Sequence, residues 1–460
     1  MSGSLSVALD SQFKISIVEE LKKLVSIPSI SFPHFDHGEV RRSAEATADL
    51  LKRSGFRNVE VMSIRNCLPY VVGDYFIDPK LPTVLLYAHH DVQPPGREEV
   101  WKTPPFVPTE INGRLYGRGT ADDKAGILIH VAAFQYWLKH YQSKFGRELP
   151  VNFKIIIEGE EEVGSDHLLD FLNLHKERLK ADTIIVTDTA NIDSGIPSLT
   201  TSLRGLVVFD IEVRSLKAPL HSGLWGGGVA DPVQALVKML GRFVNDRGEI
   251  QLKSISSSTK RREAKNIPVS RKEFAAQAGV VSEDSIPENF WQKIFFEPSF
   301  SINAIQASSE KLANNIICDR AFARFGIRLT SAEKAAEVEA EVAQKLKEWT
   351  PVGVELVVKS SSASDGWECD PEAPQNKKAF DAAIRGLDEA YGKKTCIIGC
   401  GASIPFIGPF ERALKAPVLT LGVEDPYTLA HSENESLNLS DFFKTIEGEI
   451  RLLHYLSEAR

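Results

Sequence analysis

The stretch Thr83-Val-Leu-Leu-Tyr-Ala-His-His-Asp91 joins a continuous apolar run to three polar residues. A strand with one face in solvent alternates apolar and polar side chains, so this run predicts a strand that is buried on both faces. Similar strands are predicted at 152–157 and 183–186. Helical periodicity at 125–141 lies between the opening strand and the strand at 152–157. Strands that alternate with helices indicate an α/β domain with a mostly parallel sheet flanked by helices.

The pattern changes after Asn191. The segments 205–214, 299–305 and 321–329 alternate apolar and polar residues, as strands with one exposed face do. Asp231-Pro232 provides the N-cap and the first-turn proline of a helix between them. This part of the chain is therefore predicted to be α+β, unlike the part with buried strands before it.

From about Pro374 the α/β pattern returns, which indicates that a second domain interrupts the first. We predict an α/β domain built from residues 1–191 and 370–460, with an inserted α+β domain at 192–369. Within the insertion, Lys253–Asn289 is polar and is predicted to be an irregular excursion on the surface.

The composition excludes several classes of protein. Of the 460 residues, 43% are hydrophobic and 25% are charged, as in globular domains rather than in disordered or collagen-like chains. The net charge of −8, and the lack of an apolar run near the ~20 residues of a membrane helix, predict no nucleic-acid and no membrane partner. Five cysteines without metal-finger spacing, and a start that does not resemble a secretory signal, predict a cytoplasmic protein.

Five polar segments at the ends of apolar strands could carry chemistry. Ligands of open parallel sheets bind at the carboxyl ends of the strands. The pair His89 and Asp91 suits a metal site in which the carboxylate orients the imidazole. The five segments contain His89 and Asp91, Asp122 and Asp123, Glu160 to Glu162, Asp188, and His431 in Ala430-His-Ser-Glu-Asn-Glu435.

Each segment also has a simpler interpretation. Asp122 or Asp123 could be the N-cap of the helix that follows, and residues 160–162 could form an acidic, solvated turn. Asp188 could be a cap or turn residue, and His431 could be a histidine that binds nothing. Taken together, histidines mixed with carboxylates favour zinc over calcium.

The charges of these segments support two metal ions. The carboxylates of Asp122, Glu162 and Asp188, with one bridging hydroxide, would balance the four positive charges of two divalent ions. The two histidines would bind as neutral imidazoles. Glu161 would then be free to act as a base.

From Leu24-Val-Ser-Ile-Pro-Ser29 to the segment of His431, the chain resembles the M20 family of di-zinc metallopeptidases, and most of all its cytosolic dipeptidase (carnosinase-like) branch. The resemblance covers nearly the whole chain and rests on several motifs that occur in the same order. It implies a catalytic domain with two zinc ions per subunit, which manganese or cobalt could replace. It also implies that the inserted domain is a lid or dimerisation domain.

This resemblance implies five metal ligands, a residue that orients one of them, and a general base. Asp91 would orient His89, and the Glu-Glu-x-Gly-Ser pattern of residues 161–165 makes Glu161 the general base. A cis peptide bond is expected after Asp122. The implied ligands are His89 and Asp188 at one ion, Glu162 and His431 at the other, and Asp122 as the bridge.

Motifs of the inserted domain resemble the family's lid. Pro219-Leu-His221-Ser-Gly matches a loop whose histidine polarises the scissile carbonyl. In relatives this histidine often reaches the partner subunit's site, so a homodimer is implied. Asn315 and Arg328 match positions that hold polar groups of the substrate, and Arg328 would grip a carboxylate. Ser403, in a loop that resembles Gly-Gly-Ser-Ile-Pro, would lie near the C-terminal carboxylate of the substrate. From spacing alone, His221 could be a surface histidine and Arg328 an outward strand residue.

The chain departs from the family's pattern at three places near the implied substrate pocket. Pro219 stands where relatives commonly carry Asp, and Gly399-Cys400 replaces residues that are usually charged. Residues 367–375 contain no histidine like the one that some dipeptidases place near the substrate.

These inferences predict metal-dependent hydrolysis of the amide bond in dipeptides or short peptides with a free C-terminal carboxylate. Zinc would activate water, and Glu161 would accept the proton. One alternative is deacylation of N-acyl amino acids by the same chemistry. Another is a catalytically inactive, metal-binding dimer, although a protein that only binds metal has no need of a base.

Overall fold

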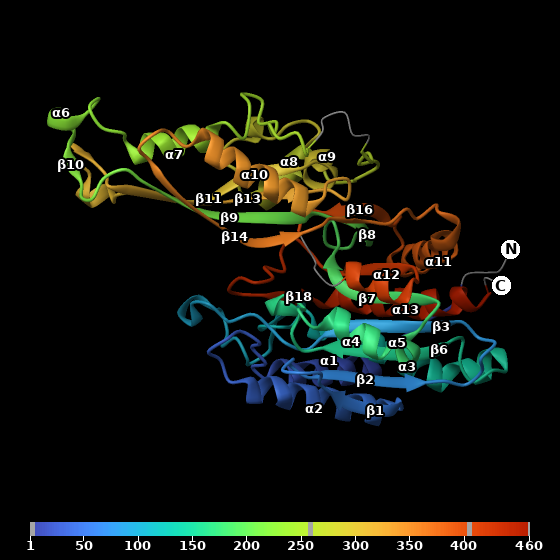
Figure 1. Ribbon diagram of the computed structural model, residues 1–460. Helices are drawn as coiled ribbons and strands as arrows, with labels where there is room; N and C mark the ends of the chain where they lie inside the picture. The colour runs from blue at the N-terminus through green and yellow to red at the C-terminus, as the bar shows by residue number, and fades with distance from the viewer. Residues whose placement is uncertain (1–4, 256–260, 403–406, 459–460) are drawn as a thin grey trace.

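The computed structural model describes residues 5–255, 261–402 and 407–458. It has two lobes, a larger one built around a large sheet and a smaller one built around a second sheet (Figure 1). The large sheet has the strand order β1-β2-β6-β3-β7-β17-β8-β15, and β16 also pairs with β8. Its strands are β1 (Arg57–Met62), β2 (Tyr70–Tyr75), β3 (Thr83–His89), β6 (Asn152–Glu158), β7 (Thr183–Ala190), β8 (Ser198–Leu203), β15 (Trp367–Glu368), β16 (Cys396–Cys400) and β17 (Val418–Glu424).

The centre of the large sheet is parallel. β3 pairs in parallel with both β6 and β7, and β7 pairs in parallel with β17. Helices pack on the sheet because its central strands are apolar on both sides, and together they form the main hydrophobic core. The predicted α/β architecture with a mostly parallel sheet is confirmed. The helices of this lobe are α1 (Ser11–Val25), α2 (His37–Ser54), α3 (Lys124–Phe145), α4 (Leu168–Leu174), α5 (Lys176–Leu179), α11 (Pro374–Tyr391), α12 (Ile407–Leu414) and α13 (Leu439–Glu458).

The smaller lobe, here called the lid, contains an antiparallel sheet with the order β11-β13-β9-β14. Its alternating strands turn apolar side chains toward two helices, and this lobe has a hydrophobic core of its own. The predicted inserted α+β unit is therefore confirmed. The elements are β9 (Gly205–Arg214), β11 (Ser299–Gln306), β13 (Arg320–Leu329), β14 (Glu355–Ser364), α7 (Pro232–Gly241) and α10 (Ala335–Trp349).

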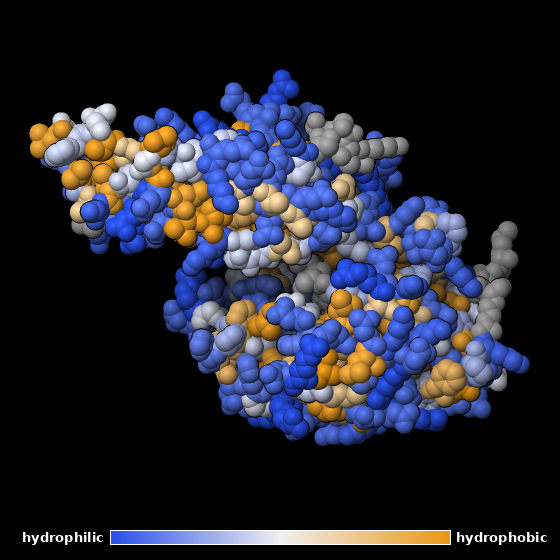
Figure 2. All heavy atoms as spheres, in the orientation of Figure 1, coloured by the Kyte–Doolittle hydropathy of each residue, from blue (hydrophilic) through white to orange (hydrophobic). Residues whose placement is uncertain are grey.

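The outer end of the lid is formed by a pair of short antiparallel strands and a helical turn. β10 (Leu220–His221) pairs with β12 (Ile316–Ile317), and α6 (Ser222–Trp225) follows β10 directly. Figure 1 shows these elements at the end of the lid that is far from α11 and α13. Apolar side chains gather at this end (Figure 2), where Leu224 and Trp225 are 78% and 52% exposed.

The segment Lys253–Asn289 is more ordered than its polar composition predicts. It contains α8 (Arg271–Ala278), whose start is stabilised by a capping box between Ser270 and Glu273. Its apolar residues join those of the following helix α9 (Phe290–Phe296) and of β16 in a small core. Most described residues of the segment are exposed, as expected for an excursion on the surface, and these apolar contacts hold it beside β16.

Candidate metal centre

The candidate site lies at the carboxyl end of the parallel strands. His89 is the last residue of β3, and Asp188 lies near the end of β7. Glu161 and Glu162 belong to the turn that follows β6. Because β3 lies between β6 and β7 in the sheet, these three strand ends bring their polar residues to one edge.

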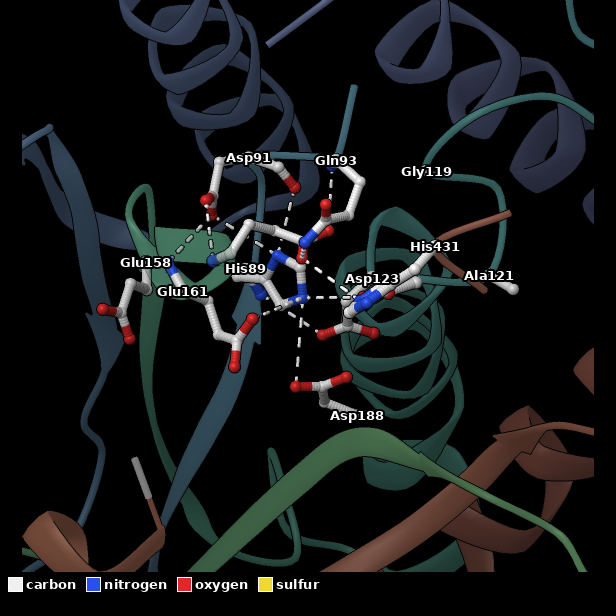
Figure 3. A network of polar contacts seen from close by, with 12 residues as sticks. His89, Asp91, Gln93, Gly119, Ala121, Asp123, Glu158, Glu161, Asp188 and His431 are labelled. Atoms are coloured by element: carbon white, nitrogen blue, oxygen red, sulfur yellow. Dashed lines mark hydrogen bonds and ion pairs between the residues drawn. The ribbon is translucent and has the colours of Figure 1, made fainter. Parts of the chain in front are cut away.

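Asp122 stands at the centre of the site. One carboxylate oxygen, Oδ1, lies 3.0 Å from His89 Nε2, and the other, Oδ2, lies 3.0 Å from His431 Nε2. The same His431 nitrogen is 3.3 Å from Glu162 Oε2, and His89 Nε2 is 3.9 Å from Asp188 Oδ2. Figure 3 shows Asp188 and His431 on two sides of the His89 ring. Two possible ligand groups thus share one aspartate, His89–Asp122–Asp188 and Asp122–Glu162–His431.

The backbone around Asp122 is held close to β3. The peptide bond between Asp122 and Asp123 is cis, as expected from the family resemblance. Asp123 does not face the two histidine rings; its Oδ2 accepts a hydrogen bond of 3.2 Å from the backbone N–H of His89. The loop before helix α3 is thereby joined to the end of the strand that carries His89.

Asp91 contacts three of the residues that were singled out in the sequence. Its Oδ1 lies 3.4 Å from Nδ1 of His89. Its two carboxylate oxygens also accept hydrogen bonds from the backbone N–H groups of Glu161 and Glu162, at 3.2 and 3.1 Å. The side chain is fully buried. Asp91 therefore fixes the turn after β6 as well as the imidazole.

Glu161 faces the pair of ligand groups without being part of either. Its Oε2 lies 4.0 Å from His89 Nε2, and its side chain is 14% exposed. Burial, followed by the charge of Asp188, raises the pKa of Glu161 well above its ordinary value. By contrast, the Glu160 side chain points away from the two ligand groups and accepts hydrogen bonds from the Tyr70 hydroxyl and from His167.

The electrostatics of the site fit bound cations. Burial and the neighbouring Asp122 raise the pKa of Glu162 to about 7, and burial raises that of Asp188 to about 6. Hydrogen bonds to Asp122 and Glu162 raise the pKa of His431 to about 11. Carboxylates held this close repel one another unless positive charge lies between them. Imidazole mixed with carboxylate is a donor set suited to zinc and its first-row neighbours, so the residues present fit two divalent ions.

Two residues of the site were missed by the sequence analysis. Gln93 donates from Nε2 to Glu162 Oε2 at 2.6 Å and from its backbone N–H to Oε1 at 3.0 Å. Glu424 ends β17, and burial followed by the charges of Asp122 and Asp188 raises its pKa well above the ordinary value. Gln93 lies two residues after Asp91, but a polar residue after a strand is also typical of a turn.

The residues predicted to act from the lid fall into two groups. His221, on β10, is exposed, and the backbone C=O of Asn315 accepts a hydrogen bond of 2.8 Å from the N–H of Ser222. His221 and Asn315 therefore lie together at the outer end of the lid, and Figure 1 shows this end apart from β3 and β7.

The second group lies where the lid meets the large sheet. Arg328 is half-buried on β13, opposite Ser299 of β11, and burial lowers its pKa. Arg204 donates to the C=O of Gly401 at 2.9 Å, and burial followed by the nearby Arg328 charge lowers its pKa to about 10. Arg328 thus lies close to the loop predicted to bind the substrate carboxylate. Ser403 itself lies outside the described residues.

Within the part of the chain that the structure describes, no helix is both long and apolar enough to cross a membrane.

Comparison with known proteins identifies the family. Residues 85–454 match the model of peptidase family M20/M25/M40. The chain is 30% identical to the cysteinylglycine-S-conjugate dipeptidase of Corynebacterium striatum, over 81% of this chain and 80% of that protein. It is also 30% identical to the Cys-Gly metallodipeptidase dug1 of Schizosaccharomyces pombe, over 96% of each.

Solved structures agree with this result. The crystal structure of human carnosine dipeptidase 1 superimposes with a TM-score of 0.80 at 26% identity and 97% coverage of both chains. The di-peptidase Dug1p of Saccharomyces cerevisiae gives a TM-score of 0.78, also at 26% identity. The family resemblance inferred from the sequence motifs is confirmed: the chain belongs to peptidase family M20/M25/M40.

Proposed function

We propose that this protein hydrolyses the amide bond of dipeptides, or of short peptides with a free C-terminal carboxylate. The observation that carries the proposal is the pair of ligand groups sharing Asp122, with Glu161 beside them. The names of the relatives, which are Cys-Gly and carnosine dipeptidases, support the substrate class. Five free cysteines support a location in the reducing cytoplasm.

In this proposal, two zinc ions occupy the two ligand groups, with manganese or cobalt able to replace them. When bound, such ions lower the pKa of water toward ~7 and polarise a carbonyl group. His89 and Asp188 would hold one ion, Glu162 and His431 would hold the other, and Asp122 would be shared by both.

The protein's own groups handle the proton. Glu161 accepts the proton of the attacking water and delivers it to the leaving amine. Asp91 keeps the Glu161 backbone and the His89 ring in place through the contacts described above. Burial and the charge of Asp188 raise the pKa of Glu161, which makes its carboxylate a stronger proton acceptor than an exposed glutamate.

Arg328 sets the requirement for a free carboxylate in this proposal, with Ser403 as its partner in binding. We expect Arg328→Met to raise KM for dipeptides about 10- to 100-fold with little change in kcat, because a charge-assisted hydrogen bond contributes roughly 1.5–3 kcal/mol. The matched control is Arg324→Met, four residues earlier on β13, where the arginine is exposed and pairs with Asp210 at 2.7 Å. Equal KM values for the two variants and the parent protein contradict the role of Arg328.

The lid is proposed to pair with a second copy of the chain. His221 and Asn315 lie at its outer end beside the exposed apolar residues Leu224 and Trp225. Exposed apolar patches of this kind mark protein–protein contacts. Docking of two lids would cover this patch and carry His221 to the partner's site, where it would stabilise the developing oxyanion.

This arrangement predicts complementation between two inactive variants. Glu161→Gln lacks the base and His221→Ala lacks the oxyanion donor, so each alone is expected to be inactive or nearly so. Mixed dimers contain one site with both groups, and activity should therefore return when the two proteins are mixed under conditions of subunit exchange. Mixed dimers that form without any recovery would show that His221 acts in its own subunit or not at all.

The proposed function is tested with a pooled library of dipeptides, tripeptides and N-acyl amino acids, analysed by mass spectrometry. Zinc-loaded protein is expected to consume dipeptides, and a chelator should stop the reaction. Consumption of N-acyl amino acids alone would instead assign the protein to deacylation. A zinc-loaded protein that consumes nothing contradicts catalysis altogether.

A further inference from the structure

We propose that Glu435 is a positioning residue that holds the loops of Asp122 and His431 together, so that both the charge and the reach of its side chain are required for tight metal binding. The inference rests on the metal centre of the proposed function. It concerns the last residue of the Ala430–Glu435 segment, to which the proposed mechanism gives no task.

Glu435 accepts hydrogen bonds from four donors of a single loop. Its Oε2 accepts from Arg118 Nη1 at 2.8 Å and from the N–H of Gly119 at 2.9 Å. Its Oε1 accepts from the N–H groups of Ala121 and Asp122 at 3.0 and 3.2 Å. Figure 3 shows Gly119 and Ala121 on the same side of the site as His431. One carboxylate therefore fixes the backbone of the residue that is shared by both ligand groups.

Arg118 extends these contacts to two further segments. Its Nη2 donates to the C=O of Ser432 at 2.9 Å and to that of Pro94 at 3.2 Å. Ser432 directly follows His431, and Pro94 directly follows Gln93, which donates to Glu162. The Arg118–Glu435 pair thus joins three segments that lead to ligands, although Glu435 lies 317 residues after Arg118.

Burial makes the contacts of Glu435 sensitive to substitution. The Glu435 residue is 0% exposed and Arg118 is 1% exposed. A glutamine would offer one acceptor oxygen, and its amide N–H₂ would face donors. Buried donors would lose their partner and the Arg118 charge would lose its counter-ion, both of which are costly. The loop that ends at Asp122 would then move away from the arrangement in which its two oxygens meet the two histidines.

The test compares metal affinity in Glu435→Gln and Glu433→Gln, measured by competition for Zn²⁺ with a chromophoric chelator. Residues that orient metal ligands typically change affinity by about 10- to 100-fold, and this loss is expected for Glu435→Gln. Glu433 lies in the same loop, is partly exposed and pairs with Arg97 at 2.8 Å. Its variant should bind Zn²⁺ like the parent protein. Absorption of the Co²⁺-loaded forms gives a second readout, because a displaced ligand changes the spectrum.

Melting temperatures separate positioning from stability. If Glu435→Gln lowers only the melting temperature and keeps the parent affinity and Co²⁺ spectrum, the proposal is overturned. Should that variant fail to fold, Glu435→Asp is used instead, because it retains the charge but has a shorter reach. A weaker Zn²⁺ affinity in Glu435→Asp supports the proposal, and a parent-like affinity overturns it. A parent protein that binds zinc but cleaves no peptide contradicts the proposed function and leaves this test intact. A parent protein that binds no zinc overturns both.

Discussion

Replacing Glu161 by glutamine is expected to lower kcat by about 10²- to 10⁴-fold, the usual contribution of a general base. The metal content should stay at the parent level, because Glu161 lies beside the two ligand groups and belongs to neither. Stopped assays with a dipeptide, together with elemental analysis of the same preparation, measure both quantities. The glutamine retains the volume of the side chain but is unable to accept the proton of water.

The neighbouring Glu160 provides the control for this variant. Its carboxylate accepts hydrogen bonds from Tyr70 and from the N–H of Leu68, away from the ligand groups. Glu160→Gln should therefore lower the melting temperature and leave kcat close to the parent value. Parent-like turnover in Glu161→Gln, or equal losses of kcat in the two variants, would remove Glu161 from the role of base.

Replacing Asp122 by asparagine is expected to abolish the binding of both ions together. Each of the two carboxylate oxygens lies 3.0 Å from a different histidine, and asparagine has a single oxygen and no charge. Elemental analysis should find less than one ion per subunit. Turnover should fall by about 10³-fold or more, which corresponds to roughly 4 kcal/mol of transition-state stabilisation.

Asp123→Asn is the matched control, since it makes the same chemical change one residue later. The Asp123 side chain accepts a hydrogen bond from the N–H of His89, and an asparagine oxygen can accept the same bond. This variant is expected to keep both ions. If Asp122→Asn also keeps two ions, the two ligand groups do not share that residue and the assignment of the bridge is wrong.

The sequence predicted those residues of the site that lie at the end of a recognisable apolar strand. The apolar run that ends at His89 requires a strand buried on both faces, and such a strand places its last residues at the ligand-binding edge of a parallel sheet. The same reasoning holds for Asp188 at the end of β7. The order of the family motifs added His431, which lies far along the chain but close to Asp122 and Glu162 in space.

The parts that were missed depend on distant partners. Gln93 and Glu435 are polar residues in loops, and only the fold shows that their partners are Glu162 and the loop of residues 118–122. Strand β8 has the sequence Ser198-Leu-Thr-Thr-Ser-Leu203. It is fully buried although four of its six residues carry a hydroxyl group, so hydropathy gave it no signal. Its place in the large sheet comes from pairing with β16 and β17, about two hundred residues later.

The position of β17 has a consequence for the order in which the protein is made. This strand lies between β7 and β8 in the large sheet, although the whole lid is translated between β8 and β17. During synthesis the growing chain holds β7 paired with β3 but without its other neighbour, β17, and long-range strand pairings of this kind close late. His431 is made after β17, so the second ligand group is incomplete until residue 431 has left the ribosome. Under the proposed assignment, metal binding at that group therefore follows the synthesis of β17 and of the whole lid.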